Sequence, residues 1–144
     1  MTSSTSKPNI GFWIISIIAL IWNLLGVHGY LQQTYNTEAF RMQYSEEQLE
    51  IIANLPAWLI AAFAIAVFSS VLGCLLMLMK KKSSILLFKI GLIAVIAQTY
   101  FNLFLNEGKQ FYGTMEYSML IMIPIISIFL VWYSKKSATK GWLS

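Results

Sequence analysis

Four long apolar stretches alternate with short polar segments along this chain of 144 residues. They cover residues 10–31, 56–79, 85–105 and 117–134, so each holds about 18–24 residues. In a helix, about 20 apolar residues at ~1.5 Å per residue cross a hydrocarbon layer of about 30 Å. The pattern therefore predicts an all-α membrane protein, in which one up-down bundle of four transmembrane helices takes up the whole chain as a single domain.

Charged residues are distributed unevenly between the polar segments. All six acidic residues follow the first or the third apolar stretch, and most basic residues precede the first stretch or follow the second and fourth. The acidic set is Glu38, Glu46, Glu47, Glu50, Glu107 and Glu116, and the main lysines are Lys7, Lys80, Lys81, Lys82, Lys135, Lys136 and Lys140. Because lysine and arginine are retained on the cytoplasmic side during insertion, both termini are predicted to be cytoplasmic.

The composition agrees with a membrane location. Hydrophobic residues make up 58% of the chain and charged residues 11%, against about 45–50% and about 25% in soluble domains. The net charge of +4 does not indicate nucleic-acid binding, because the lysines lie beside helix ends, where lipid headgroups sit. The predicted partner is the lipid bilayer, together with a second copy of the chain or another membrane protein.

A short additional helix is predicted near residues 46–54, between the first two apolar stretches. Ser45 can accept a hydrogen bond from the amide of Gln48, and the glutamine side chain can return one to Ser45. Leu49 and Ile52 give this segment one apolar face, and its glutamates give it a polar face. We expect it to lie on the outward-facing surface of the membrane that the helices cross, or over the mouth of the bundle.

Reactive side chains are scarce. The chain has no aspartate, no glutamate inside an apolar stretch, one histidine (His28) and one cysteine (Cys74). A zinc site needs three or four protein ligands, and a nucleophilic triad needs an acid at the depth of its histidine. The sequence therefore predicts a protein that is not an enzyme and that carries no metal or cofactor.

Small residues recur at every fourth position of the second apolar stretch, at Ala62, Ala66, Ser70 and Cys74. This spacing lets helix backbones approach closely in lipid. The face is predicted to pack either inside the bundle or between protomers.

Uncharged polar residues follow one face of each of two other helices. Asn23 and Tyr30 share a face of the first, with Gly26 between them, and Gln98 and Asn102 share a face of the third. The preferred interpretation is that buried amides hydrogen-bond between helices and stabilise the bundle, by about 0.6–2 kcal/mol each. Gly26 would let the third helix approach, so that Gln98 or Asn102 can bond to Asn23. The alternative is a narrow pocket, open to the outside, that binds a small neutral solute.

Several segments resemble a family of small bacterial inner-membrane proteins with four helices, whose members are sometimes loosely labelled sugar transporters. The similar segments are residues 22–26 (WNLLG), 56–58 (PAW), 64–68 (AIAVF), 71–74 (VLGC) and 140–143 (KGWL). The likeness covers residues 10–143 and implies a multi-pass location in the bacterial inner membrane. It carries over no functional residues.

Two functions follow as hypotheses. The preferred one is a non-enzymatic structural or accessory bundle that packs with itself or with a membrane partner. The alternative is an oligomeric transporter or binding protein for a small, sugar-like solute, because one copy has too few helices for a two-lobed transporter.

Overall fold

The computed structural model describes residues 7–144, and this part of the chain is helical, with no strand. Four helices are long and apolar enough to cross a membrane. They are α1 (Ile10–Tyr35), α4 (Ala57–Leu78), α5 (Ser83–Tyr100), which continues as the π-helix η1 (Phe101–Leu105), and α6 (Thr114–Thr139). The prediction of an all-α chain with four apolar helices is confirmed.

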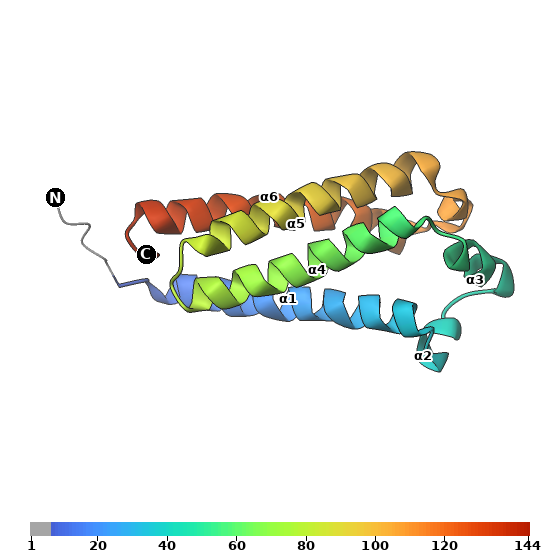
Figure 1. Cartoon of the computed structure of the whole chain (residues 1–144), viewed down its shortest axis with the longest axis horizontal. Coiled ribbons are helices and arrows are strands. Elements are labelled where there is room, and N and C mark those ends of the chain that lie inside the picture. Colours follow the sequence, from blue (N-terminus) through green and yellow to red (C-terminus); the bar gives the residue numbers. More distant parts are fainter. Residues whose placement is uncertain (1–6) are drawn as a thin grey trace.

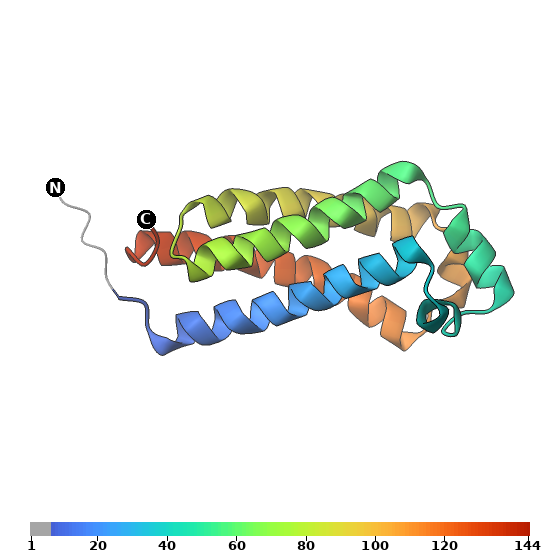
Figure 2. The same cartoon turned by 60° about the horizontal axis from the view of Figure 1, so that its bottom comes forward.

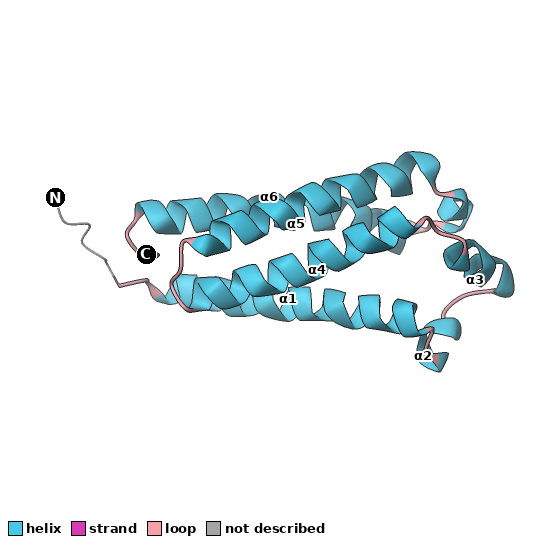
Figure 3. Cartoon of the chain, in the orientation of Figure 1, coloured by secondary structure: helices cyan, strands magenta, loops and turns pink. Residues whose placement is uncertain are grey.

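The long helices lie side by side in chain order, and each runs opposite to the one before it (Figure 1). α1 packs on α4, α4 on α5 and α5 on α6. The C-terminus and the start of α1 lie at one end, and the short helices lie at the other (Figures 1 and 3). We call the first the lysine end and the second the acidic end. The short helices are α2 (Glu38–Arg41), α3 (Glu46–Ala53) and the 3-10 helix η2 (Glu107–Phe111).

Two of the long helices extend beyond the apolar stretches that predicted them. The prediction of 10–31 was too short because α1 continues to Tyr35, and 117–134 was too short because α6 runs from Thr114 to Thr139. Helical hydrogen bonds continue past the last apolar residue until the backbone changes conformation. α1 ends where Asn36 adopts a left-handed conformation (φ 51°), which asparagine tolerates better than most residues.

Two further helices end with the same turn. Lys80 (φ 60°) follows α4 and Gly141 (φ 80°) follows α6. The amide after each of them donates to a carbonyl five residues back, Lys81 to Leu76 at 2.9 Å and Trp142 to Ser137 at 3.0 Å. This Schellman motif satisfies carbonyls that would otherwise lack partners. Glycine suits it, whereas lysine at the same position is strained.

Helix α3 begins as the sequence predicts. The amide of Gln48 donates to Ser45 Oγ at 3.2 Å, and the amide of Ser45 donates to Gln48 Oε1 at 3.0 Å. This reciprocal pair is the predicted capping box. The helix contacts η2, so the two polar connections meet at the acidic end.

The small-residue face of α4 packs inside the chain, where Ser70 meets α5 and Cys74 contacts Asn23 of α1. Its four residues, Ala62, Ala66, Ser70 and Cys74, are all buried. A Cβ atom placed on Gly91 of α5 would lie 2.7 Å from Ser70 Oγ, so the two helices touch where Gly91 lacks a side chain. Of the two predicted locations, the structure uses the one within the bundle.

The lysine end has a closely packed core. Phe12 and Cys74 are fully buried, and Met77, Phe88 and Leu143 join them in one cluster. This cluster draws on all four long helices and on the segment after α6. That segment folds back, because the Ser144 amide donates to the Lys80 carbonyl (2.9 Å) and the Lys82 amide to the Ser144 carbonyl (3.1 Å). The connection between α4 and α5 is thereby tied to the end of α6.

Candidate functional site

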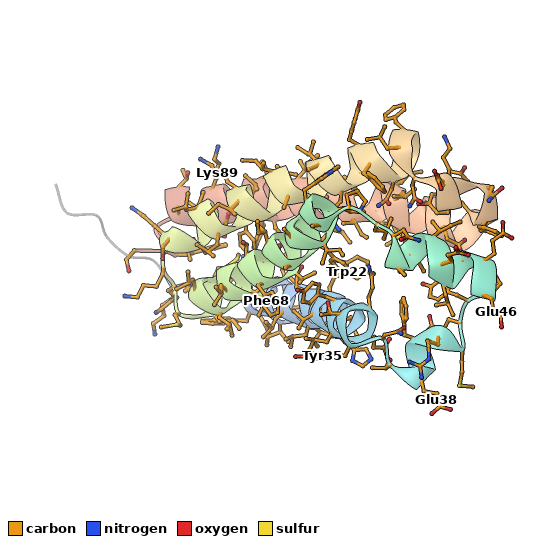
Figure 4. The ribbon with its side chains drawn as sticks, turned by 45° about the vertical axis from the view of Figure 1, so that its right-hand side comes forward. Trp22, Tyr35, Glu38, Glu46, Phe68 and Lys89 are labelled. Atoms are coloured by element: carbon orange, nitrogen blue, oxygen red, sulfur yellow. The ribbon has the colours of Figure 1, made fainter. Side chains whose placement is uncertain are left out.

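A cavity of about 450 Å³ lies between the four long helices. Most of its lining is apolar, and the uncharged polar residues Asn23, Gln98 and Asn102 also line it. Trp22 of α1 is among the lining residues and lies between the helices in Figure 4, whereas Lys89 of α5 points away from the bundle. Other lining residues include Gly26, Phe63, Ala66, Val67, Val95, Ile123, Ile126 and Leu130.

The cavity exists because α1 and α6 are packed at one end only. The buried residues of α1 are Phe12, Ser16 and Ala19, all in its lysine-end half. The buried residues of α6 all follow Phe129, again at the lysine end. In Figure 2 the two helices cross near the middle of the bundle, and their acidic-end halves lie apart. Side chains from both helices line the space between them.

Asn23 marks the lysine-end limit of the polar lining. Its Nδ2 donates to the Ala19 carbonyl at 2.9 Å and makes a long contact with Cys74 Sγ at 3.5 Å. A carbonyl can only accept a hydrogen bond, so the Asn23 nitrogen must face Ala19 and its Oδ1 faces the other way. Within residues 7–144, Oδ1 accepts no hydrogen bond.

The partner expected for Asn23 was different. The sequence suggested that Gly26 would let the helix with Gln98 and Asn102 approach. Instead, a Cβ on Gly26 would lie 3.1 Å from Val67 Cγ1, so Gly26 allows α4 to approach. The cross-helix contact of Asn23 is likewise with α4. Helices next to each other in sequence are usually neighbours in space. Here α4, rather than the helix with Gln98 and Asn102, packs on α1.

Asn102 belongs to a small hydrogen-bond network at the acidic end. The amide of Gly108 donates to Asn106 Oδ1 at 2.8 Å, which fixes the orientation of that side chain. Asn106 Nδ2 then donates to Asn102 Oδ1 at 3.1 Å and to the Tyr112 hydroxyl at 3.0 Å. Because its oxygen is occupied, Asn102 has its Nδ2 group left to donate toward a ligand.

Tyr112 supports this network as a neutral phenol. Burial raises its pKa; the hydrogen bond from Asn106 lowers it, and the nearby Tyr117 and Glu116 raise it further. The net pKa lies above its ordinary value of about 10, so the hydroxyl keeps its proton at neutral pH. It can therefore donate to Asn102 Oδ1, from which it lies 3.5 Å away.

Gln98 and Tyr30 have different surroundings. Gln98 lines the cavity, and its side chain makes no hydrogen bond within residues 7–144. Tyr30 packs edge-on against Phe63 at 5.3 Å and Phe68 at 5.7 Å and is not a lining residue. The structure thus brings Asn23, Gln98 and Asn102 to one cavity and leaves Tyr30 outside it.

The sequence did not indicate Asn106 and Tyr112 as part of the site. Asn106 was detectable in principle, because asparagine before a glycine-containing turn often caps it, as Asn106 does for η2. Nothing in the sequence indicated the π-helix that carries Asn102. A π segment inserts an extra residue into a turn and often occurs at functional sites.

Among residues 7–144, the lining contains no titratable side chain. His28 and Lys89 are both exposed, and no cluster of histidine, cysteine and acidic residues that suits a metal ion occurs within residues 7–144. A scan against protein-family profiles, a search of curated proteins and a search of solved structures each gave no match. The cavity can bind a ligand by apolar contact and by neutral hydrogen bonds.

Proposed function

We propose that this chain is a multi-pass membrane protein that binds a small uncharged solute between its helices. The supporting observation is the cavity itself, with Asn23, Gln98 and Asn102 on its lining. If these amides served only to join helices, their polar atoms would be expected to bond to neighbouring helices. Asn23 Nδ2 does contact Cys74 of α4, but within residues 7–144 Asn23 Oδ1, Asn102 Nδ2 and the side chain of Gln98 have no hydrogen-bond partner.

The proposed orientation places the lysine end in the cytoplasm and the acidic end outside. It rests on the charge distribution, because the clustered lysines at residues 80–82 and 135–140 lie at the end that the positive-inside rule assigns to the cytoplasm. In this orientation, α3 and η2 cover the outer end, and Gln98 and Asn102 lie nearest the outer medium. The bacterial inner membrane is proposed on the family resemblance alone.

Access to the cavity provides the first test. Gln98→Cys, in a background with Cys74→Ala, places a thiol on the lining, and Ala94→Cys places one on the same helix among buried residues. N-ethylmaleimide should modify the thiol at position 98 at least about tenfold faster than the thiol at position 94, because thiol reactivity requires a hydrated, ionisable sulfur. Equal, slow modification at both positions would contradict a solute site.

An accessory role is the second candidate, and α6 now supports it. The outward side of α6 is apolar, with Ile121, Ile125 and Ile128 all more than half exposed. A second copy or a partner helix could cover this face in place of lipid. Disulfide crosslinking through Ile125→Cys should then trap a defined complex, while crosslinking through Ala66→Cys should not, because Ala66 is buried within the chain.

A further inference from the structure

We propose that the cavity holds the single alkyl chain of an uncharged amphiphile, whose polar head lies at the acidic end beside Asn102. This inference rests on the proposed function and specifies its ligand. Four features of the cavity support it: its length, its width, its polarity and its open side.

The length follows from the contacts between helices. Asn23 contacts Cys74, one helical turn toward the lysine end from Ser70, and Ser70 faces Gly91. Asn102 lies eleven residues beyond Gly91 toward the acidic end. At ~1.5 Å per residue, the two asparagines are therefore separated by about 20 Å along the bundle. Trp58 and Phe101 pair at 5.6 Å, which places Asn102 at the acidic end of α4 as this estimate requires.

The width follows from the volume. A volume of about 450 Å³ spread over about 20 Å gives a mean cross-section of roughly 20 Å². This mean value is close to the cross-sectional area of one extended alkyl chain. Since an extended chain advances about 1.2 Å per bond, the slot accommodates about 12 carbons below a head group.

The polarity of the slot selects a neutral molecule with one polar end. No charged side chain from the described part of the chain lines it, so a charged ligand would lose hydration without gaining an opposite charge. At the acidic end, Asn102 offers Nδ2 as a donor, because Asn106 and Gly108 fix its oxygen in the network. The head group therefore needs an acceptor, such as a carbonyl or hydroxyl oxygen. The middle of the slot is mostly apolar, at Val67, Val95 and Ile126, and its polar groups are the uncharged side chains of Ser70, Ser127 and Gln98.

We place the open side of the slot between α1 and α6, which make few contacts with each other, toward the hydrocarbon of the bilayer. α1 and α6 both line the slot, and their acidic-end halves contain no buried residue. A chain dissolved in the membrane can enter between these helices without crossing water. A sugar or another wholly hydrophilic solute has no comparable route.

A photoreactive probe in phosphatidylcholine nanodiscs tests the proposal. The probe is 1-monododecanoylglycerol with a diazirine in its chain, and adducts are mapped by mass spectrometry. Adducts at Ile126 should fall at least about fivefold when excess unmodified 1-monododecanoylglycerol competes. Adducts at the neighbouring Ile125, which faces lipid, should barely change. Dodecyltrimethylammonium, with the same chain and a fixed charge, should not compete.

Two variants provide matched controls. Ile126→Trp should fill the slot and abolish the competable adducts, while Ile125→Trp on the lipid side should leave them intact. Asn102→Leu should weaken competition by 1-monododecanoylglycerol about threefold to tenfold, because the head group loses one hydrogen bond. Melting of each variant shows that it is folded.

The outcomes separate this inference from the proposed function. Equal competition by the charged amphiphile, or adducts at lipid-facing residues alone, would overturn the alkyl-chain proposal. If the thiol of the Gln98→Cys variant were still readily modified, the solute site would stand with a different ligand. If that thiol were also unreactive, both proposals would fail.

Discussion

The two halves of the bundle use similar residues to opposite effect. At the lysine end, α1 and α6 both contribute to one core, with Phe12 and Cys74 at 0% exposure and Phe88 at 2%. At the acidic end, the same two helices separate and leave a cavity with amides on its lining. Apolar residues predominate in the long helices of both halves. The difference comes from which helix faces have a packing partner.

Small side chains explain how the lysine end closes. Ser16 and Ser84 are fully buried there, and their hydroxyls have no hydrogen-bond partner among residues 7–144. Each unpartnered hydroxyl costs about 1–3 kcal/mol, so their benefit is close packing of the helices rather than bonding. The connections at the acidic end are longer, with residues 36–56 between α1 and α4 against residues 79–82 between α4 and α5.

The largest expected effect tests the core of the lysine end. Phe88→Ala should lower the free energy of unfolding by about 3–5 kcal/mol, because it leaves a void in a packed cluster. Phe104→Ala is the matched control, since Phe104 is 68% exposed and should cost less than about 1 kcal/mol. Unfolding in mixed micelles measures both. Similar losses for the two variants would show that the halves do not differ in packing.

Two glycines sharpen the comparison at the contact between helices. Gly91→Ala forces a Cβ to 2.7 Å from Ser70 Oγ and should destabilise by about 1–3 kcal/mol. Gly29→Ala has nothing within 4 Å, so it should stabilise α1 by up to about 1 kcal/mol through helix propensity. Thermal unfolding of the purified variants shows whether each substitution raises or lowers the stability of the protein. A neutral Gly91→Ala would mean that α4 and α5 do not touch there.

Asn23 lies where the halves meet. Asn23→Leu should cost about 1 kcal/mol or less, because it gives up weak bonds and gains apolar contact. Asn23→Ala should cost more, since it enlarges the cavity. Both variants should also change competition by 1-monododecanoylglycerol if Asn23 limits the slot. Stability is measured by melting and ligand competition by photolabelling, and a leucine variant less stable than the alanine variant would contradict this account.

The smallest effect concerns the turn after α4. Lys80→Gly should stabilise the protein by about 1 kcal/mol, because φ 60° strains any residue with a side chain. Lys81→Gly, with one lysine removed from the same cluster, should not stabilise. Chemical unfolding of the two variants provides the comparison. Equal changes in the free energy of unfolding would show that the lost charge, rather than relief of backbone strain, causes the effect of Lys80→Gly.

Local signals in the sequence were sufficient for part of the fold. The Ser45–Gln48 capping box depends on four consecutive residues, and it occurs as predicted. The apolar stretches are also local features of the sequence, and they predicted the four long helices. Helix ends were less predictable: Lys80 adopts a left-handed conformation that lysine rarely favours, so no residue signalled that turn.

Nonlocal choices could not be predicted from the sequence. Small residues on α4 indicated close packing but not which helix they would meet. The polar faces with Asn23, Gln98 and Asn102 indicated a shared site, whereas the contact of Gly26 with Val67 depends on the order of helices around the bundle. The same is true of Leu143, a residue after the last apolar stretch that becomes part of the core.

Water contact in the two halves tests the central claim most directly. Solid-state NMR of the protein in lipid bilayers can measure magnetisation transfer from water to individual side chains. The transfer should be fast at the amides of Gln98 and Asn102 and slow at the side chains of Met77 and Phe88. Slow transfer at all four residues would contradict an accessible cavity in the acidic half.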